Sequence, residues 1–219
     1  MDCQEIDQLI EESHLLKHEF YQAWNKGLLS KKCLKEYALN YYHHVKAFPR
    51  YLSAVHANCE EESTRRILLE NLVEEEGGSP NHPMLWRQFC HSLGATEEEI
   101  DAHKPIGSMK DLVDMFFEIS KDGSTEEGVA ALYAYESQIP EISRSKIDGL
   151  VKFYEMKDPK DWQYFAVHIE ADELHRQEER ALLDKFTDNV EASKDAVKAV
   201  LQKLNQFLTE MLERHPTAA

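Results

Sequence analysis

The sequence predicts an all-α protein, folded as a single-domain helical bundle of about seven to nine helices. Apolar residues recur at helical spacing along nearly the whole chain, and the alternation typical of β-strands is absent. Glycine and proline are few, 8 and 7 in 219 residues, and most lie where a helix is expected to end. No repeat or linker divides the chain. We therefore expect one helical domain over residues 1–215 and a frayed tail over residues 216–219.

Turn signals divide the first half of the chain into helices. We expect these helices over about residues 4–25, 30–60 and 63–76, with a short one from about 81 to 93. Pro49 predicts a kink or break in the second helix, because proline lacks an N–H and crowds the preceding turn. The segment Gly77-Gly78-Ser79-Pro80 is a strong turn signal that ends the third helix.

Side-chain caps predict the helix starts in the second half. Capping boxes, in which serine or threonine precedes an acidic residue by three positions, occur at Thr96 with Glu99, Ser108 with Asp111 and Ser124 with Glu127. Asp158-Pro159 is expected to supply the N-cap and first residue of a long helix. A final helix is expected over about residues 190–214, with an apolar face made by Val197, Val200, Leu201, Leu204, Leu208 and Met211.

The acidic composition excludes some classes of partner. The chain has 25 Lys and Arg against 41 Asp and Glu, and its formal net charge of −16 would repel nucleic acid and an anionic membrane surface. No apolar run approaches the roughly 20 residues needed to cross a bilayer. The four cysteines lie far apart, and the N-terminus lacks the pattern of a signal peptide. We therefore expect a soluble, cytoplasmic protein with no nucleic-acid and no membrane partner.

The segment from His168 to His175 carries the strongest signal for chemistry. Asp172 lies roughly 40° and His175 roughly 20° from His168 around a helix axis, so the three side chains form one stripe. Asp172 and His175 also have the i, i+3 spacing that carboxylate-bridged di-metal bundles use. This stripe predicts a metal site, and the alternative is a solvated or salt-bridged helix face. Glu179 extends the stripe as a supporting group or an ion-pair partner.

Other helices must supply further ligands. Glu75 closes the third helix, and the turn that follows can fold His82 back beside it. Glu136 lies in an apolar and aromatic stretch that should be buried, where an unpaired carboxylate is very costly. Taken alone, Glu75 would be a solvated member of an acidic run, and Glu136 would be paired with Lys or Arg. A metal cation satisfies both carboxylates in a single site.

Together the six side chains supply three carboxylates and three imidazoles. Such a set suits two metal ions roughly 3.5–4 Å apart, bridged by carboxylate. Ligation by nitrogen and oxygen without thiolate favours iron or manganese over structural zinc. We therefore expect two metal ions, Fe/Fe or Fe/Mn, and dioxygen as a co-substrate at open positions. The expected ligands are Glu75, His82, Glu136, His168, Asp172 and His175.

Three segments that carry these ligands resemble a known family. Residues 71–82 (NLVEEEGGSPNH), 133–140 (YAYESQIP) and 168–175 (HIEADELH) resemble the chlamydial family named for its association with death domains. That family belongs to a superfamily with a haem-oxygenase-like helical fold, alongside thiaminase II-type and pyrroloquinoline-quinone-synthase-like proteins. The similarity runs from about Ile10 to Phe186 without an evident gap, and all six ligand positions match. It implies a haem-oxygenase-like di-metal oxidase.

The resemblance also implies an activity, the formation of 4-aminobenzoate for folate biosynthesis by a protein that consumes its own side chain. The sacrificed tyrosine of the family matches Tyr21, the lysine that supplies the amino group matches Lys146, and a second active-site tyrosine matches Tyr37. The residues by themselves predict less. Tyr21 would be a core aromatic on an amphipathic helix, and Lys146 would be a solvated charge.

Two other functions are open as alternatives. The family's name implies binding to host death-domain receptors, which would make the chain a modulator of apoptosis that is secreted into the host cell. Such docking needs an exposed apolar or charged face. A thiaminase-like hydrolase is the other alternative, and it would need an activated cysteine, for which Cys59 and Cys90 are candidates by elimination. A homodimer is a further expectation, because it is common on this fold.

Overall fold

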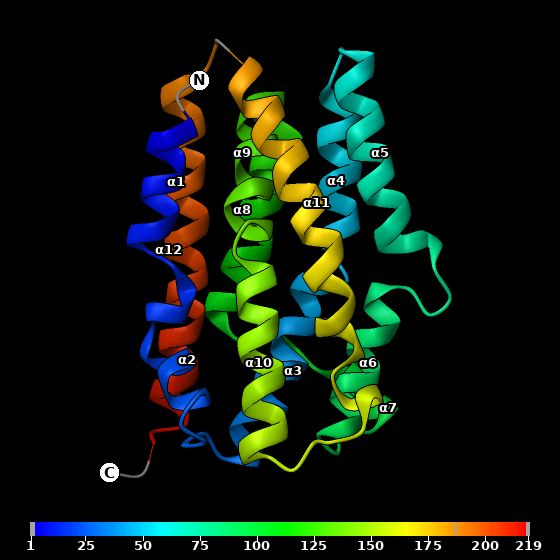
Figure 1. The fold of residues 1–219 in the computed structure, drawn as a ribbon, viewed down its shortest axis with the longest axis vertical. Helices are drawn as coiled ribbons and strands as arrows, with labels where there is room; N and C mark the ends of the chain where they lie inside the picture. The colour runs from blue at the N-terminus through cyan, green and yellow to red at the C-terminus, as the bar shows by residue number, and fades with distance from the viewer. Residues whose placement is uncertain (1–2, 187, 218–219) are drawn as a thin grey trace.

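The structure, a computed structural model, describes residues 3–186 and 188–217, which form a bundle of helices (Figure 1). No strand occurs in these residues, so the all-α prediction is confirmed. Within this described part of the chain, twelve α-helical segments and two 3-10 turns follow one another as α1 (Cys3–Glu12), η1 (Leu15–Lys17), α2 (Glu19–Trp24), α3 (Lys31–Val45), α4 (Phe48–Asn58), α5 (Glu62–Gly77), α6 (His82–Ser92), α7 (Glu97–Ala102), α8 (Gly107–Asp122), α9 (Thr125–Glu136), α10 (Ile139–Phe153), η2 (Pro159–Asp161), α11 (Gln163–Lys185) and α12 (Val190–Arg214).

The helix expected over about residues 4–25 is divided into α1, η1 and α2. Two histidines restart the helix. His14 Nδ1 accepts a hydrogen bond from Leu16 N at 3.2 Å, and His18 Nδ1 accepts one from Phe20 N at 3.1 Å. Each imidazole thus caps the turn that follows it. The sequence did not indicate these breaks, because histidine is not among the residues that usually cap helices.

The expected helix over about residues 30–60 is also two helices, α3 and α4. The chain leaves α3 after Val45, and Pro49 lies in the first turn of α4. At that position the missing N–H of proline costs no hydrogen bond, because the first turn of a helix has no acceptor for it. Pro49 therefore marks a helix start, and the predicted break precedes it by a few residues.

Two of the three predicted capping boxes are confirmed. The boxes that begin at Thr96 and Ser124 start α7 and α9. The box at Ser108 is wrong, because α8 already begins at Gly107. The backbone N–H of Ser108 donates instead to Glu210 Oε2 on α12, at 3.0 Å. A partner from a distant helix thus replaces the local cap that the sequence pattern predicted.

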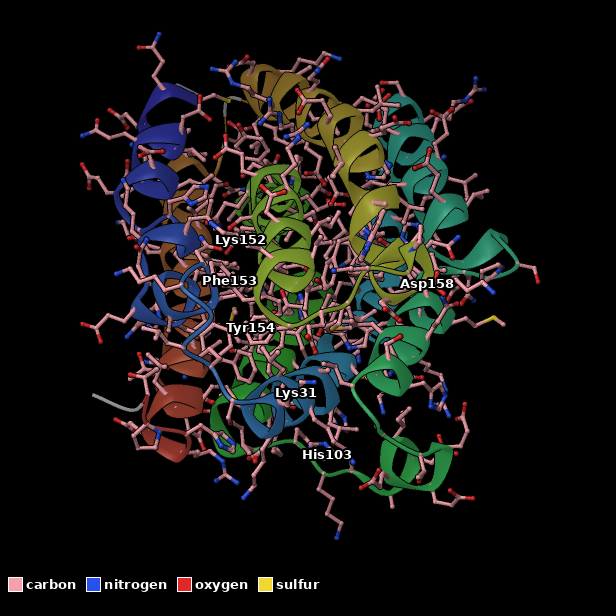
Figure 2. All side chains as sticks on the ribbon, turned by 60° about the horizontal axis from the view of Figure 1, so that its bottom comes forward. Lys31, His103, Lys152, Phe153, Tyr154 and Asp158 are labelled. Carbon is pink, nitrogen blue, oxygen red and sulfur yellow. The ribbon has the colours of Figure 1, made fainter. Side chains whose placement is uncertain are left out.

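Asp158 caps a shorter element than expected. Its Oδ1 accepts a hydrogen bond from Lys160 N at 3.1 Å, which starts η2, while the long helix α11 begins only at Gln163. The expected start of the long helix was therefore a few residues early. Figure 2 shows the connection from Tyr154, at the end of α10, to Asp158 running across the molecule toward η2 and α11.

Helix α9 lies at the centre of the bundle. It packs against α12 and α8 and against α11 and α4, so that all residues from Gly128 to Glu136 are buried (Figure 1). Gly128 permits this close packing, because a Cβ there would lie 2.6 Å from Val55 Cγ2 on α4. The last residue of α9, Glu136, is therefore carried into the interior, where an unpaired carboxylate is costly.

In the part of the chain that the structure describes, no helix is both long and apolar enough to cross a membrane. Helix α12 ends at Arg214, and residues 216–217 of the expected tail are not helical. The rest of that tail, residues 218–219, lies outside the described residues.

Candidate metal centre

The structure brings the six expected ligands together as two adjoining triads. One triad consists of Glu75, His82 and His168, and the other of Glu136, Asp172 and His175. Within each triad the ligand atoms lie within 4.8 Å of one another, and all six residues are buried. Helices α5, α6 and α9 supply one residue each, and α11 supplies the stripe of three.

The first triad is built around Glu75, in the last turn of α5. Its Oε1 lies 3.0 Å from His82 Nδ1 and 3.8 Å from His168 Nε2. The turn after α5 returns His82 beside Glu75, as the Gly-Gly-Ser-Pro segment predicted. The other ring nitrogen of His168, Nδ1, donates to Tyr164 O at 2.6 Å, which leaves Nε2 to face the triad.

The second triad joins the end of α9 to α11. His175 Nδ1 lies 3.5 Å from Glu136 Oε1 and 3.5 Å from Asp172 Oδ1. Asn71, on α5, donates from Nδ2 to Glu136 Oε1 at 3.0 Å. Taken alone, Glu136 is predicted to pair with Lys or Arg, and this prediction is wrong. A neutral amide and the His175 imidazole contact this carboxylate instead, and no Lys or Arg of residues 3–186 and 188–217 forms an ion pair with it.

The electrostatics of both triads fit a bound cation. Burial raises the pKa of Glu75, but hydrogen bonds with His168 and His82 outweigh it and bring the pKa to about 2. Burial raises the pKa of Asp172 to about 6. Asp172 Oδ2 and Glu136 Oε2 have no hydrogen-bond partner, although buried polar atoms are nearly always paired. Divalent cations would satisfy these oxygens, so the residues present fit a metal pair.

A fourth buried carboxylate, Glu179, lies behind the second triad. Burial, and then the neighbouring Glu136 carboxylate, raise the pKa of Glu179 well above its ordinary value. Neither of its oxygens has a hydrogen-bond partner in the described structure. The ion-pair partner that the sequence left open for Glu179 is therefore absent from residues 3–186 and 188–217.

A small closed cavity faces the ligands. Its volume is about 10 Å³, which is space for about one water molecule. It is lined by Val45, Phe48, Glu75, Tyr135, Glu136, Tyr164, His168 and Asp172. A separate aromatic ring does not fit in this space.

Tyr21, Tyr37 and Lys146 form a second buried cluster. Lys146 Nζ donates to Tyr37 Oη at 2.8 Å, and Tyr37 Oη lies 3.3 Å from Tyr21 Oη. Lys146 is only 3% exposed, so the expectation of a solvated charge is wrong. Burial lowers the pKa of this amine to about 7, and no carboxylate pairs with it among the described residues. Such an amine is largely neutral just above neutral pH.

Aromatic rings enclose the lysine amine. Six ring centroids lie 4.9–5.9 Å from Lys146 Nζ, those of Tyr21, Trp24, Tyr37, Tyr41, Trp86 and Phe165. The rings exclude water from the amine and from the Tyr21 ring. They come from α2, α3, α6 and α11, so four separate segments of the chain must converge to form the enclosure.

Tyrosine side chains connect the two buried clusters. The ring of Tyr37 stacks on that of Tyr41 at 5.3 Å between centroids, and Tyr41 Oη donates to Tyr135 Oη at 3.1 Å. Tyr135 lines the metal cavity. Tyr41 and Tyr135 are not among the site residues predicted from the sequence. Two signals could have indicated them: Tyr41 follows Tyr37 at helical spacing, and Tyr135 precedes the ligand Glu136.

The two cysteines considered for hydrolysis lie elsewhere. Cys90 is buried in α6, and burial raises the pKa of its thiol to about 12, so that the reactive thiolate is scarce. Cys59, also buried, follows α4 and donates from Sγ to Glu61 O. Neither lines the cavity that faces the triads.

An all-α bundle with two buried triads of carboxylate and imidazole is the architecture of a di-metal protein. The chain belongs to the TENA/THI-4/PQQC family, whose model matches residues 3–214. It is 45% identical over 210 residues to a 4-aminobenzoate synthase of Chlamydia trachomatis, covering 95% of this chain and 91% of that protein. It is 41% identical over 205 residues to a 4-aminobenzoate synthase of Nitrosomonas europaea, covering 90% and 83% of the two chains.

A solved structure supports the same fold. A domain of unknown function with a heme oxygenase-like fold from Shewanella denitrificans superposes with a TM-score of 0.79 at 18% identity. The match covers 96% of this chain and 90% of that chain. The haem-oxygenase-like fold and the family predicted from the sequence are therefore confirmed.

Metal addition is expected to stabilise the protein. Ions that bind only the folded chain stabilise it by about 2.7 kcal/mol at a hundredfold excess over the Kd, enough to raise the Tm by roughly 5–10 °C. Thermal unfolding of chelator-treated protein with and without Mn²⁺ measures this shift. Glu75→Gln should reduce it, because one triad loses its carboxylate. An unchanged Tm at saturating Mn²⁺ would argue against a metal centre.

Proposed function

We propose that this chain forms 4-aminobenzoate, as a di-metal enzyme that uses dioxygen and takes the aromatic ring from its own Tyr21. Relatives named as 4-aminobenzoate synthases are 41–45% identical to it over at least 90% of its length. The two buried triads supply the ligands of the metal pair. The assignment of the ring to Tyr21 and of the amino group to Lys146 rests on the buried cluster that these two residues form with Tyr37.

The observation that carries the proposal is the placement of a tyrosine and an uncompensated amine inside one closed aromatic enclosure. Tyr21 is 2% exposed and Lys146 is 3% exposed. The cavity at the metal ligands has a volume of about 10 Å³, too small for a separate aromatic substrate. A ring that belongs to the chain needs no entry path, which favours Tyr21 as the source of the product's carbon atoms.

The product's structure fits this origin. In 4-aminobenzoate the carboxyl group lies para to the nitrogen, as Cβ of tyrosine lies para to the hydroxyl. Breaking the Cα–Cβ bond of Tyr21 and oxidising Cβ would give the ring and the carboxyl group. The nitrogen of Lys146 would replace the phenolic oxygen, which leaves as water, and the Cε–Nζ bond would break as dioxygen oxidises Cε to an aldehyde. A bound Fe/Fe or Fe/Mn pair would supply the activation of dioxygen, the oxidant that this change requires.

The chain's own residues prepare the two reacting groups. The apolar enclosure favours the neutral amine of Lys146, whose lone pair is then available for bond formation. Tyr37 accepts a hydrogen bond from Lys146 and contacts the hydroxyl of Tyr21, so it aligns both groups. The ring of Tyr37 also stacks on that of Tyr41, whose hydroxyl donates to Tyr135 at the metal cavity, so the two clusters pack directly against each other.

Loss of one ligand carboxylate tests the role of the metal centre. Asp172→Asn is expected to abolish 4-aminobenzoate formation after the metal-loaded protein is reduced and exposed to air, because the second triad loses one of its two carboxylates. Mass spectrometry of the released product, and growth of a dependent strain without 4-aminobenzoate, measure the effect. Glu170→Gln is the matched control, since Glu170 is exposed on the same helix. Wild-type yield from Asp172→Asn would refute the proposal.

A further inference from the structure

An exposed carboxylate contacts one of the ligand imidazoles. Glu74 Oε2 lies 3.1 Å from His175 Nε2, and the Glu74 side chain is 46% exposed while that of His175 is 2% exposed. Glu74 precedes the ligand Glu75 on α5, and its side chain contacts His175 on α11, which packs against α5. Among the six ligand residues, His175 thus has a partner that reaches it from the solvent side.

The two ring nitrogens of His175 face different groups. Nε2 faces Glu74, while Nδ1 lies 3.5 Å from both Glu136 Oε1 and Asp172 Oδ1 and has no hydrogen-bond partner. A neutral imidazole carries one N–H, and an ionised carboxylate can only accept it. With the proton on Nε2, the nitrogen that faces Glu74, the lone pair of Nδ1 is directed into the second triad.

We propose that Glu74 is a positioning residue of the metal centre, which fixes the tautomer and orientation of His175 and so sets the affinity of the second triad for a divalent cation. This inference rests on the di-metal centre proposed above. Carboxylate partners of ligand imidazoles hold the ring in place and increase its basicity, and their loss costs about 10–100-fold in metal affinity.

In the first triad a different kind of group holds the ligand imidazole. His168 Nδ1 donates to the backbone oxygen of Tyr164, a neutral acceptor inside α11 that no side-chain substitution removes. The second triad instead depends on a charged side chain that is partly in solvent. The two metal positions are therefore unequal, and a change at Glu74 should weaken one position and leave the other unaltered.

The acidic run 74–76 provides a matched control. Glu75 is a buried ligand, whereas Glu74 and Glu76 are both exposed on the same turn of α5. Glu76→Gln removes the same charge from the same turn of α5 as Glu74→Gln, at a position that faces away from α11. Glu74→Ala removes the acceptor altogether, while Glu74→Gln keeps an acceptor oxygen without the charge. Affinity for the second ion should therefore fall in the order wild type, Glu74→Gln, Glu74→Ala.

Titration of the metal-free full-length protein with Co²⁺, followed by visible absorption and calorimetry, tests the proposal. We expect the wild type and Glu76→Gln to bind two ions alike, and Glu74→Ala to bind the second ion about 10–100-fold more weakly with the first unchanged. In the Co²⁺-loaded protein, the shifted N–H proton of His175 should also exchange faster with water in Glu74→Ala, while that of His168 exchanges as in the wild type, whereas general destabilisation of the fold would speed both.

The outcomes separate this inference from the function on which it rests. If the wild type binds two ions and Glu74→Ala binds both with unchanged affinity, the role of Glu74 is refuted and the metal centre stands. If Glu74→Ala and Glu76→Gln weaken the second ion equally, general surface charge accounts for the effect and the positioning role is refuted. If the wild type binds no Co²⁺ pair at all, the di-metal centre itself is refuted.

Discussion

Tyr21→Phe is expected to abolish 4-aminobenzoate formation while the protein folds and binds metal. The hydroxyl of Tyr21 contacts Tyr37, and the phenylalanine ring has no oxygen that the amine of Lys146 could replace. Because the substitution keeps the ring in the aromatic cluster, it should cost little in folding stability compared with a truncation to alanine. Product analysis after a single exposure of reduced, metal-loaded protein to air measures the effect.

Isotopic labelling gives the same prediction a direct test. Protein made with ring-labelled tyrosine should release labelled 4-aminobenzoate, at no more than one molecule per chain. Tyr51→Phe is the matched control, because Tyr51 is fully buried, its hydroxyl has no partner, and its ring stacks on Phe116 rather than lying in the Lys146 enclosure. Unlabelled product, or several molecules per chain, would show that the ring comes from a separate substrate.

Lys146→Met is expected to abolish the product and to stabilise the fold. The burial that lowers the pKa of Lys146 from 10.5 to about 7 disfavours the protonated amine. Between pH 7 and 10.5 the unfolded chain binds the proton and the folded chain does not. The free energy of unfolding of the wild type should therefore rise with pH in this window, by at most about 1.4 kcal/mol per pH unit. The Lys146→Met variant lacks the amine, so its free energy of unfolding lacks this contribution to the pH dependence.

Denaturant unfolding of both proteins between pH 6 and 10 measures the difference. The advantage of Lys146→Met should be largest near and below pH 7 and should shrink as the pH approaches 10.5. Product yield from the wild type should rise through about pH 7, as the amine becomes neutral. Lys152→Met, on the exposed face of the same helix, is the control. An identical pH dependence in the wild type and Lys146→Met would contradict the assigned pKa.

The helical fold and the convergence of the ligands could be predicted because local patterns encode them. Helical periodicity runs along the chain, and the spacing of His168, Asp172 and His175 places them on one stripe whatever the tertiary packing. The turn after α5 likewise encodes the approach of His82 to Glu75, which the structure places 3.0 Å apart. Each of these features depends on residues that are close in sequence.

Features that depend on distant residues could not be predicted. Lys146 looks like a surface charge in its own helix, and only the packing of α2, α3, α6 and α11 around it makes its environment apolar. Glu74 looks like an ordinary member of an acidic run until α11 is placed against α5. Two local features also differ from the prediction: the break at His14 and the use of Asp158 for η2 depend on caps to backbone N–H groups two residues away, which residue type alone does not specify.

The dense packing around Tyr21 has a consequence for the fate of the protein. Its ring is buried and contacts those of Phe20 and Trp24. A chain that has given up this ring would retain an empty volume in its core, and a large-to-small change of this kind typically costs about 3–5 kcal/mol. That loss is a large fraction of the roughly 5–15 kcal/mol that holds a domain folded. Chains that have lost the Tyr21 ring would then unfold and be degraded before intact ones. The supply of 4-aminobenzoate would therefore follow the rate of translation rather than the amount of accumulated enzyme.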